Sequence, residues 1–228
     1  MGSANAELWE IENERLLNLL REALEPGDGY LDVGANVGIF AIPVAEHLGP
    51  EGRVYAFEPA PDMAEELMIR AESVGVADRI DLRQVALGAE PATLSLRVDP
   101  EDPSDATKRS LFVEGDVVAE VPVHPLDDLV ASGVLLLDRP LQAVKIDVEG
   151  AEVLCLRGMR STLRTHHPRL VVIETIESHL HRAGFELADI DGELEPLGYT
   201  RLAQDPATGL WFNAVFAFAG DRASRAAR

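Results

Sequence analysis

Two rhythms of apolar and polar positions run along this chain, one typical of helices and one typical of strands. In residues 7–25 the apolar side chains return at nearly helical spacing until Pro26-Gly27 ends the pattern, so an amphipathic helix is expected there. Further along, short apolar runs bounded by glycine, proline or polar residues alternate with stretches of helical periodicity. The pattern predicts strands at 30–33, 54–57, 80–84, 143–146 and 170–173, and helices from about Gly38 to Leu48, at 62–74, at 126–130 and from about Ala151.

The alternation of strands and helices favours an α/β fold with a doubly wound, mainly parallel sheet, because each helix carries the chain back for the next parallel strand. Residues 93–98 and 117–123 depart from it, alternating like strands on either side of a polar stretch at 99–110. This predicts an inserted β-hairpin with a mobile loop. After a helical or irregular stretch that reaches Leu197, residues 199–203 and 211–217 predict a terminal antiparallel pair.

The length of 228 residues fits one α/β domain better than two. We expect its core at about 26–218, with the N-terminal helix in front of it and a frayed tail at 219–228. Met1-Gly2-Ser3 resembles a cloning remnant and is expected to be frayed as well.

The charge balance excludes one class of partner. The chain has 40 acidic and 20 basic residues, a formal net charge of −20, which would repel nucleic acid and disfavour a strongly anionic acceptor. The single cysteine, Cys155, excludes an internal disulfide framework and a zinc site of paired cysteines, and so favours the cytoplasm. No apolar run approaches the roughly 20 residues that cross a bilayer, and the acidic N-terminus is unlike a signal peptide. A homodimer is compatible with this composition.

The segment Leu31-Asp32-Val33-Gly34-Ala35-Asn36-Val37-Gly38 lies between a predicted strand and a predicted helix, where α/β proteins bind cofactors. Gly34 and Gly38 would let the backbone pass close to a ligand. Glu58, twenty positions after Gly38 at the end of the next strand, can accept hydrogen bonds from two ribose hydroxyls. A dinucleotide fingerprint fails, because Asn36 and Ile39 stand where it needs its second and third glycines. The spacing of Asp32, Gly34 and Gly38 is instead typical of enzymes that use S-adenosylmethionine.

Further motifs occur in the order and spacing of one known family. They are the segments 30–40 and 54–59, Val85-Ala86-Leu87-Gly88, Leu126-Asp127-Asp128-Leu129, Val144-Lys145-Ile146-Asp147-Val148-Glu149-Gly150-Ala151-Glu152, and Leu156-Arg157-Gly158. With them, the chain resembles the FkbM family of S-adenosylmethionine-dependent methyltransferases over about residues 14–218. The resemblance implies a class I methyltransferase (Rossmann-like) fold with a seven-stranded sheet, S-adenosylmethionine as cofactor and S-adenosylhomocysteine as product. It also implies a small-molecule acceptor, namely a hydroxyl of a sugar, a polyketide or another natural product.

The resemblance assigns residues to both halves of the reaction. It places Asp147 and Glu149 at the end of the fourth strand, facing the transferred methyl group. Catalysis would come largely from holding donor and acceptor in line, helped by a base that takes the hydroxyl proton. The donor would be held by Asp32, Gly34, Ala35, Asn36, Gly38, Glu58 and Asp147, with Gln84 and Val85 at the adenine. The candidate bases are Asp147, Glu149, Glu174 after the fifth strand, and His179 or His181 beyond it.

Other interpretations of the same residues stay open. Lys145, Asp147 and Glu149 would also suit a salt-bridged rim, and Glu152 is expected to be solvated at the start of a helix. Asp147, Glu149 and Glu152 offer oxygen ligands of the kind that divalent ions prefer, but no metal site is expected. The chain could instead methylate nitrogen or a carboxylate, or bind without turnover.

Overall fold

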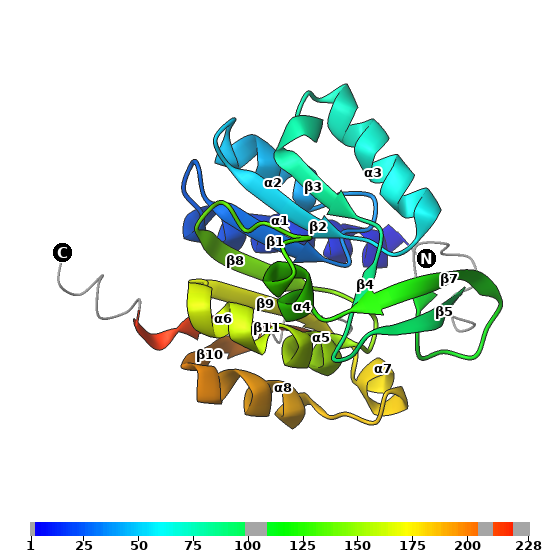
Figure 1. Ribbon diagram of the computed structural model, residues 1–228. Helices are drawn as coiled ribbons and strands as arrows, with labels where there is room; N and C mark the ends of the chain where they lie inside the picture. Colours follow the sequence, from blue (N-terminus) through cyan, green and yellow to red (C-terminus); the bar gives the residue numbers. More distant parts are fainter. Residues whose placement is uncertain (1–2, 99–108, 205–211, 221–228) are drawn as a thin grey trace.

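A seven-stranded sheet forms the centre of the computed structural model, which describes residues 3–98, 109–204 and 212–220 (Figure 1). Its strand order is β10-β11-β9-β8-β1-β2-β3. Neighbouring strands are parallel, except that β11 is antiparallel to both β9 and β10. The strands are β1 (Gly29–Val33), β2 (Arg53–Phe57), β3 (Ile80–Arg83), β8 (Leu141–Ile146), β9 (Leu170–Thr175), β10 (Tyr199–Gln204) and β11 (Phe212–Phe218).

Helices cover the sheet on both faces (Figure 1), which is why all five residues of β1 are buried. On one face α1 (Ser3–Ala23), α2 (Ala41–Leu48) and α3 (Pro61–Ser73) pack around Tyr30, Val54 and Val172. The helices α4 (Leu126–Ala131), α5 (Glu152–Gly158), α6 (Arg160–His166), α7 (Glu177–Arg182) and α8 (Leu187–Leu194) contribute to the second core cluster. Two 3₁₀ turns, Ala77–Arg79 and Glu195–Leu197, complete the described helical segments. None of the described helices has the length and apolar character needed to span a bilayer.

The inserted hairpin is part of a small second sheet, with the order β4-β7-β5-β6. Its strands are β4 (Ala86–Leu87), β5 (Ala92–Val98), β6 (Arg109–Ser110) and β7 (Val117–His124). The long strands β5 and β7 pair antiparallel, as predicted, and Leu96 and Val121 pack against Ala60 in a core of their own. The polar stretch predicted as a loop falls at 99–108 outside the described residues, and its last two positions form β6.

The predicted fold class is confirmed, with the predicted strands placed within one or two residues at most ends. One expectation about the elements needs correction: Ser3 is helical and not frayed, so α1 begins four residues before the predicted start. The stretch predicted to be helical or irregular up to Leu197 holds α7 and α8, and α8 begins with a capping box of Glu186 and Asp189. The predicted terminal antiparallel pair is present, with β11 between β9 and β10 and with β10 at one edge of the sheet.

Candidate functional site

The candidate residues gather at one edge of the large sheet. β1, β2, β8 and β9 are parallel, so the segments that follow them meet at their carboxyl ends. These segments carry the loop at 34–38, Glu58, the turn at 147–150 and Glu174. Residues far apart in the chain therefore reach one site.

Gly34 is required by the protein itself as well as by any ligand. Its φ is +82°, and a Cβ built there would lie 1.8 Å from the carbonyl oxygen of Asp147. Gly38 has φ +86°, and its Cβ would lie 2.8 Å from Cδ1 of Ile42. The spacing of the two glycines predicts close approach of a ligand, whereas in the structure each glycine also makes room for neighbouring protein atoms.

Glu58 ties the glycine loop to the end of β2. Its Oε2 accepts a hydrogen bond from the backbone N–H of Asn36 at 2.8 Å, and its Oε1 accepts one from Ala60 at 2.8 Å. Burial raises the pKa of Glu58 to about 7, against the lowering effect of these two N–H donors and of Arg109. A carboxylate offers about four acceptor positions, so two remain for hydroxyl donors such as those of a ribose.

Asp32 is a buried carboxylate with unused acceptor capacity. The residue is 1% exposed, and burial raises its pKa to about 6, opposed by the charge of Lys145 and by the Tyr30 hydroxyl. Among the described residues, no donor makes a hydrogen bond of normal geometry with either carboxylate oxygen. Because unpaired buried acceptors are costly, this position suits a bound donor such as an ammonium group.

Lys145 is the cation at the centre of the site. Its side chain is 2% exposed, its Nζ lies 2.8 Å from Oδ2 of Asp147, and it sits 4.6 Å above the ring of Phe40. The predicted Lys145–Asp147 ion pair is therefore present, with Lys145 buried and the Asp147 side chain 27% exposed, so only its acidic partner reaches the solvent. Glu149 belongs to a different pair, described below.

Asp147 and Glu174 shift each other's pKa in opposite directions. Burial would raise the pKa of Asp147, but the charge of Lys145 and a hydrogen bond from Glu174 outweigh it and hold the pKa below its usual range. Burial and the charge of Asp147 raise the pKa of Glu174 well above normal. Of the two carboxyl groups, Asp147 is therefore the one that ionises more readily and Glu174 the one that keeps its proton to higher pH.

The turn after β8 brings Glu149 to His179 on α7. Oε2 of Glu149 and Nδ1 of His179 are 2.7 Å apart. The backbone of Glu149 is left-handed, with φ 55°, and its carbonyl oxygen accepts a hydrogen bond from Oγ of Ser110 at 2.6 Å. The other candidate histidine, His181, is exposed.

Glu152 contradicts the expectation of a solvated helix start. The residue is 2% exposed, burial raises its pKa to about 7, and its Oε1 accepts a hydrogen bond from the N–H of Gly150 at 3.0 Å. Sequence position alone does not reveal this, because the turn at 147–150 folds over the first residue of α5. Within the described ranges, no three His, Cys, Asp or Glu side chains are grouped so as to hold a metal ion.

Two predicted adenine contacts lie at the same edge, and two further residues were missed. Gln84 and Val85 directly follow β3, with Gln84 exposed and Val85 half-buried.

Arg109 and Ser110 of β6 were not predicted at the site. Arg109 donates to both carboxylate oxygens of Asp62 at 2.5 and 2.6 Å, and it lies 47 residues away in sequence, so no local pattern signals the contact.

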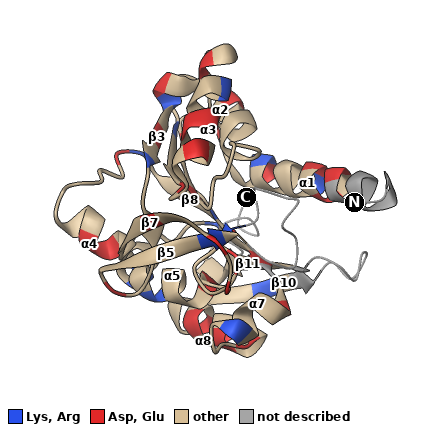
Figure 2. Cartoon of the chain, turned by 90° about the vertical axis from the view of Figure 1, so that its right-hand side faces the viewer, with Lys and Arg blue, Asp and Glu red and all other residues tan. Residues whose placement is uncertain are grey.

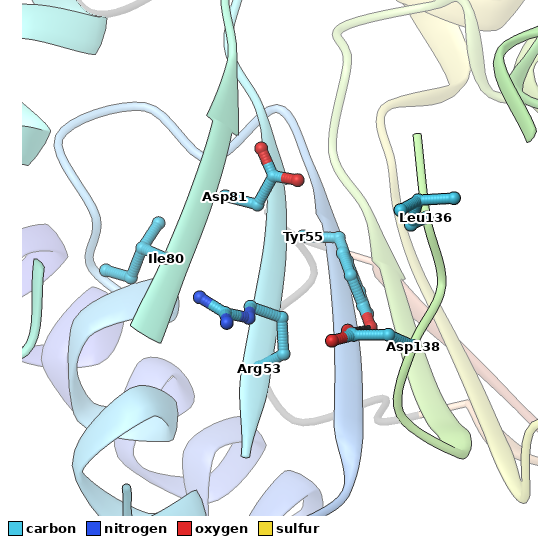
Figure 3. Close-up of a pocket in the computed structure, with 6 residues that line it drawn as sticks. All are labelled: Arg53, Tyr55, Ile80, Asp81, Leu136 and Asp138. Atoms are coloured by element: carbon cyan, nitrogen blue, oxygen red, sulfur yellow. Dashed lines mark hydrogen bonds between the residues drawn. The ribbon is translucent and has the colours of Figure 1, made fainter. Parts of the chain in front are cut away.

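A surface pocket of about 380 Å³ lies elsewhere on the molecule (Figure 3). Arg53 and Ile80 on its wall are the first residues of β2 and β3, so it lies toward the amino ends of these strands, away from the candidate site. Tyr55 donates from its hydroxyl to Oδ1 of Asp138 there, at 2.8 Å. Acidic residues are spread over several helices of the described chain, with basic residues among them (Figure 2).

Known proteins share both the sequence pattern and the fold. Residues 32–201 match the family model described as the Methyltransferase FkbM domain. The hexuronic acid methyltransferase AglP of Haloferax volcanii is 31% identical over 163 residues, covering 70% of this chain and 63% of that protein. The 31-O-demethyl-FK506 methyltransferase FkbM of Streptomyces tacrolimicus is 30% identical over 210 residues, covering 80% of this chain and 77% of that protein.

Solved structures extend the likeness to the fold. Methyltransferase FkbM from Methylobacillus flagellatus KT superposes with a TM-score of 0.56 at 20% identity, covering 84% of this chain and 43% of that one. The O-methyltransferase TomG from Streptomyces achromogenes, solved with S-adenosylmethionine, gives a TM-score of 0.54 at 15% identity, covering 91% and 78%. The chain spans about three fifths of the length of the first two curated relatives, 63% and 59%.

Proposed function

The chain belongs to the FkbM methyltransferase family, and from that premise we propose that it transfers the methyl group of S-adenosylmethionine to a hydroxyl oxygen of a sugar, a polyketide or another natural product. The family implies the cofactor, and the fold is that of class I methyltransferases. The proposal includes the predicted single domain of residues 1–228, with its core at about 26–218. The acceptor class is supported by the names of two relatives, one for a hexuronic acid and one for 31-O-demethyl-FK506.

The residues at the sheet edge fit the cofactor. Glu58, at the end of β2, keeps acceptor capacity for the ribose hydroxyls. The oxygens of buried Asp32 lie near the Tyr30 hydroxyl, but no described donor meets them with normal hydrogen-bond geometry, so they keep acceptor capacity as well. We assign donor binding to Asp32, Gly34, Ala35, Asn36, Gly38, Glu58 and Asp147, with Gln84 and Val85 at the adenine. When bound, the cofactor supplies an electrophilic methyl group on a positively charged sulfur.

Asp147, Glu149 and Glu174 form the proposed methyl-transfer edge. Their elements would hold the donor and the acceptor close together and in line, which can supply most of the rate enhancement of an in-line displacement. The ionised Asp147 also places negative charge where the cationic donor binds. Methylation of a carboxylate is the second candidate, since a hexuronic acid bears both a carboxylate and hydroxyls, and the name of that relative does not say which is methylated.

The observation that carries the proposal is the Glu58 carboxylate, fixed by the N–H groups of Asn36 and Ala60 beside the glycine loop. Calorimetric titration with S-adenosylhomocysteine tests it. We expect micromolar binding by the wild type and at least tenfold weaker binding by Glu58→Ala, because the ribose loses its acceptor. Glu65→Ala, an exposed position on α3, is the matched control and should bind normally. If the wild-type protein is folded but does not bind S-adenosylhomocysteine, the methyltransferase proposal is wrong, and a binding role without methyl transfer would be the remaining candidate.

A further inference from the structure

Two side chains from different elements meet beside the proposed methyl-transfer edge. Glu149 follows β8, and His179 lies on α7 after β9. Oε2 of Glu149 is 2.7 Å from Nδ1 of His179, which is an ion-pair distance when the ring is protonated, although the two atoms do not meet with hydrogen-bond geometry. Their side chains are 17% and 7% exposed, respectively. Because water is largely excluded, the interaction of the two groups is stronger than that of an exposed pair.

The backbone holds this pair in place. Glu149 adopts a left-handed φ of 55°, which is uncommon for a residue with a side chain. Ser110 fixes the turn by donating to the carbonyl oxygen of Glu149. Gly150 packs so closely on α7 that a Cβ would lie 2.9 Å from the carbonyl oxygen of His179. Strained conformations of this kind persist where the surroundings over-determine them, and they are common at functional sites.

The other titratable groups at this edge are poor proton acceptors. Asp147 is paired with Lys145 at 2.8 Å, and Glu174 is next to Asp147, whose charge together with burial raises the pKa of Glu174 well above its usual value. Both oxygens of Glu58 accept backbone N–H groups, and Glu152 is enclosed beneath the turn. A histidine ring is the side chain that ordinarily exchanges protons near neutrality. Among the described groups at this edge, His179 is therefore the best suited to take a proton during turnover.

We propose that His179 accepts the proton of the methylated hydroxyl through Nε2, that Glu149 positions the ring through Nδ1, and that the acceptor is therefore a hydroxyl and not a carboxylate. This inference rests on the proposed function. His179 takes the hydroxyl proton while the oxygen keeps that electron pair and bonds to the methyl carbon. The pair of the broken carbon–sulfur bond goes to sulfur, which leaves as a neutral thioether. The imidazolium so formed is stabilised by Glu149 and later releases its proton to water.

A carboxylate acceptor would have no use for this arrangement. It is already ionised at neutral pH and needs no base. It would also bring a further negative charge next to Asp147 and Glu149, on a chain with a formal net charge of −20. A neutral hydroxyl avoids this repulsion and needs the base that the pair provides.

Several charged groups surround the pair and bear on its pH dependence. Glu152, Asp147 and Glu174 lie around the turn, with Lys145 behind them. Glu177, His181 and Arg182 are the other ionisable groups of α7. The experiment therefore compares pH profiles between variants and does not interpret one profile alone.

The test compares His179→Asn with His166→Asn, a matched control at the carboxyl end of α6, which lies before β9 and so at the opposite end of the strand from the site. The probe acceptors are 31-O-demethyl-FK506 and methyl α-D-glucopyranosiduronic acid. Methylation of a hydroxyl gives an ether, and methylation of the carboxylate gives an ester. We expect ether products, and a loss of kcat/KM of about 10²–10⁴-fold for His179→Asn, with the acid limb of the pH profile abolished. Affinity of His179→Asn for S-adenosylhomocysteine should stay within about twofold of the wild-type value, and His166→Asn should behave as wild type.

A second variant tests the positioning role of Glu149. Glu149→Gln should lower kcat/KM by about ten- to a hundredfold, because it removes the negative charge that lies 2.7 Å from Nδ1 of the imidazolium. Nitrogen-15 NMR of the neutral His179 ring should show its hydrogen on Nδ1 in the wild type, and that preference should be lost in Glu149→Gln. This readout needs no acceptor, so it decides the inference even if neither probe is methylated or if His179→Asn fails to fold.

Each outcome separates the inference from the proposed function. Unchanged kcat/KM and pH profile in His179→Asn, an ester product, or a wild-type ring with its hydrogen on Nε2 would overturn the inference while leaving a methyltransferase. A wild-type protein that is folded, does not bind S-adenosylhomocysteine and methylates neither probe would instead overturn the proposed function.

Discussion

Replacing Gly34 by alanine tests how the cofactor loop is built. Two costs are expected. Alanine at a φ of +82° costs about 1–2 kcal/mol, because Cβ crowds its own carbonyl oxygen. The new Cβ would also lie 1.8 Å from the carbonyl oxygen of Asp147, and relieving such overpacking costs about 1–3 kcal/mol more. The free energy of unfolding should therefore fall by about 2–5 kcal/mol.

Gly75→Ala separates the two costs. Gly75 also has a positive φ, +74°, but nothing lies within 4 Å of the Cβ that would be built there. This variant should lose only the conformational part, about 1–2 kcal/mol. The gain from a stiffer unfolded chain is similar in both variants and cancels in the comparison.

The assay is urea unfolding of both variants, followed by titration with S-adenosylhomocysteine. Gly34→Ala should be less stable than Gly75→Ala by about 1–3 kcal/mol, or several degrees in Tm for a chain of this size. It should also bind the ligand at least tenfold more weakly, since the clash moves either the loop or Asp147. Equal stability of the two variants would refute the packing of the loop against Asp147.

Two further predictions concern the buried charges. Because the folded pKa of Glu152, about 7, lies above its usual 4.5, the stability it contributes is complete below about pH 4.5 and is lost as the pH rises through 7. Glu152→Gln should accordingly raise stability at pH 8.5 by up to about 3 kcal/mol and much less at pH 5.5, and a Tm difference that does not vary with pH would contradict this. Lys145→Met should lower the free energy of unfolding by about 3–5 kcal/mol in urea at pH 7.5, because it leaves the charge of Asp147 without its partner. Adding Asp147→Asn should restore part of that loss. A Lys145→Met variant as stable as wild type would show that the ion pair is not needed for stability.

Much of this protein follows from its sequence because the signals are local. The strands and helices were predicted from periodicity, which depends on neighbours within a few residues. The glycine loop and Glu58 were linked because consecutive parallel strands bring their carboxyl ends to one edge. The family was recognised from contiguous motifs such as the one around Asp147.

Tertiary structure decided what depends on distant partners. The position of Glu152 at the start of a predicted helix indicates an exposed side chain, yet the turn around Gly150 buries it. Arg109 reaches Asp62 only because the small sheet folds back onto α3. Glu149 and His179 were both candidates, but their pairing follows from the packing of α7 on the turn. Burial, close approach and pKa shifts are properties of the assembled chain, because each is set by groups that the chain brings together only when it folds.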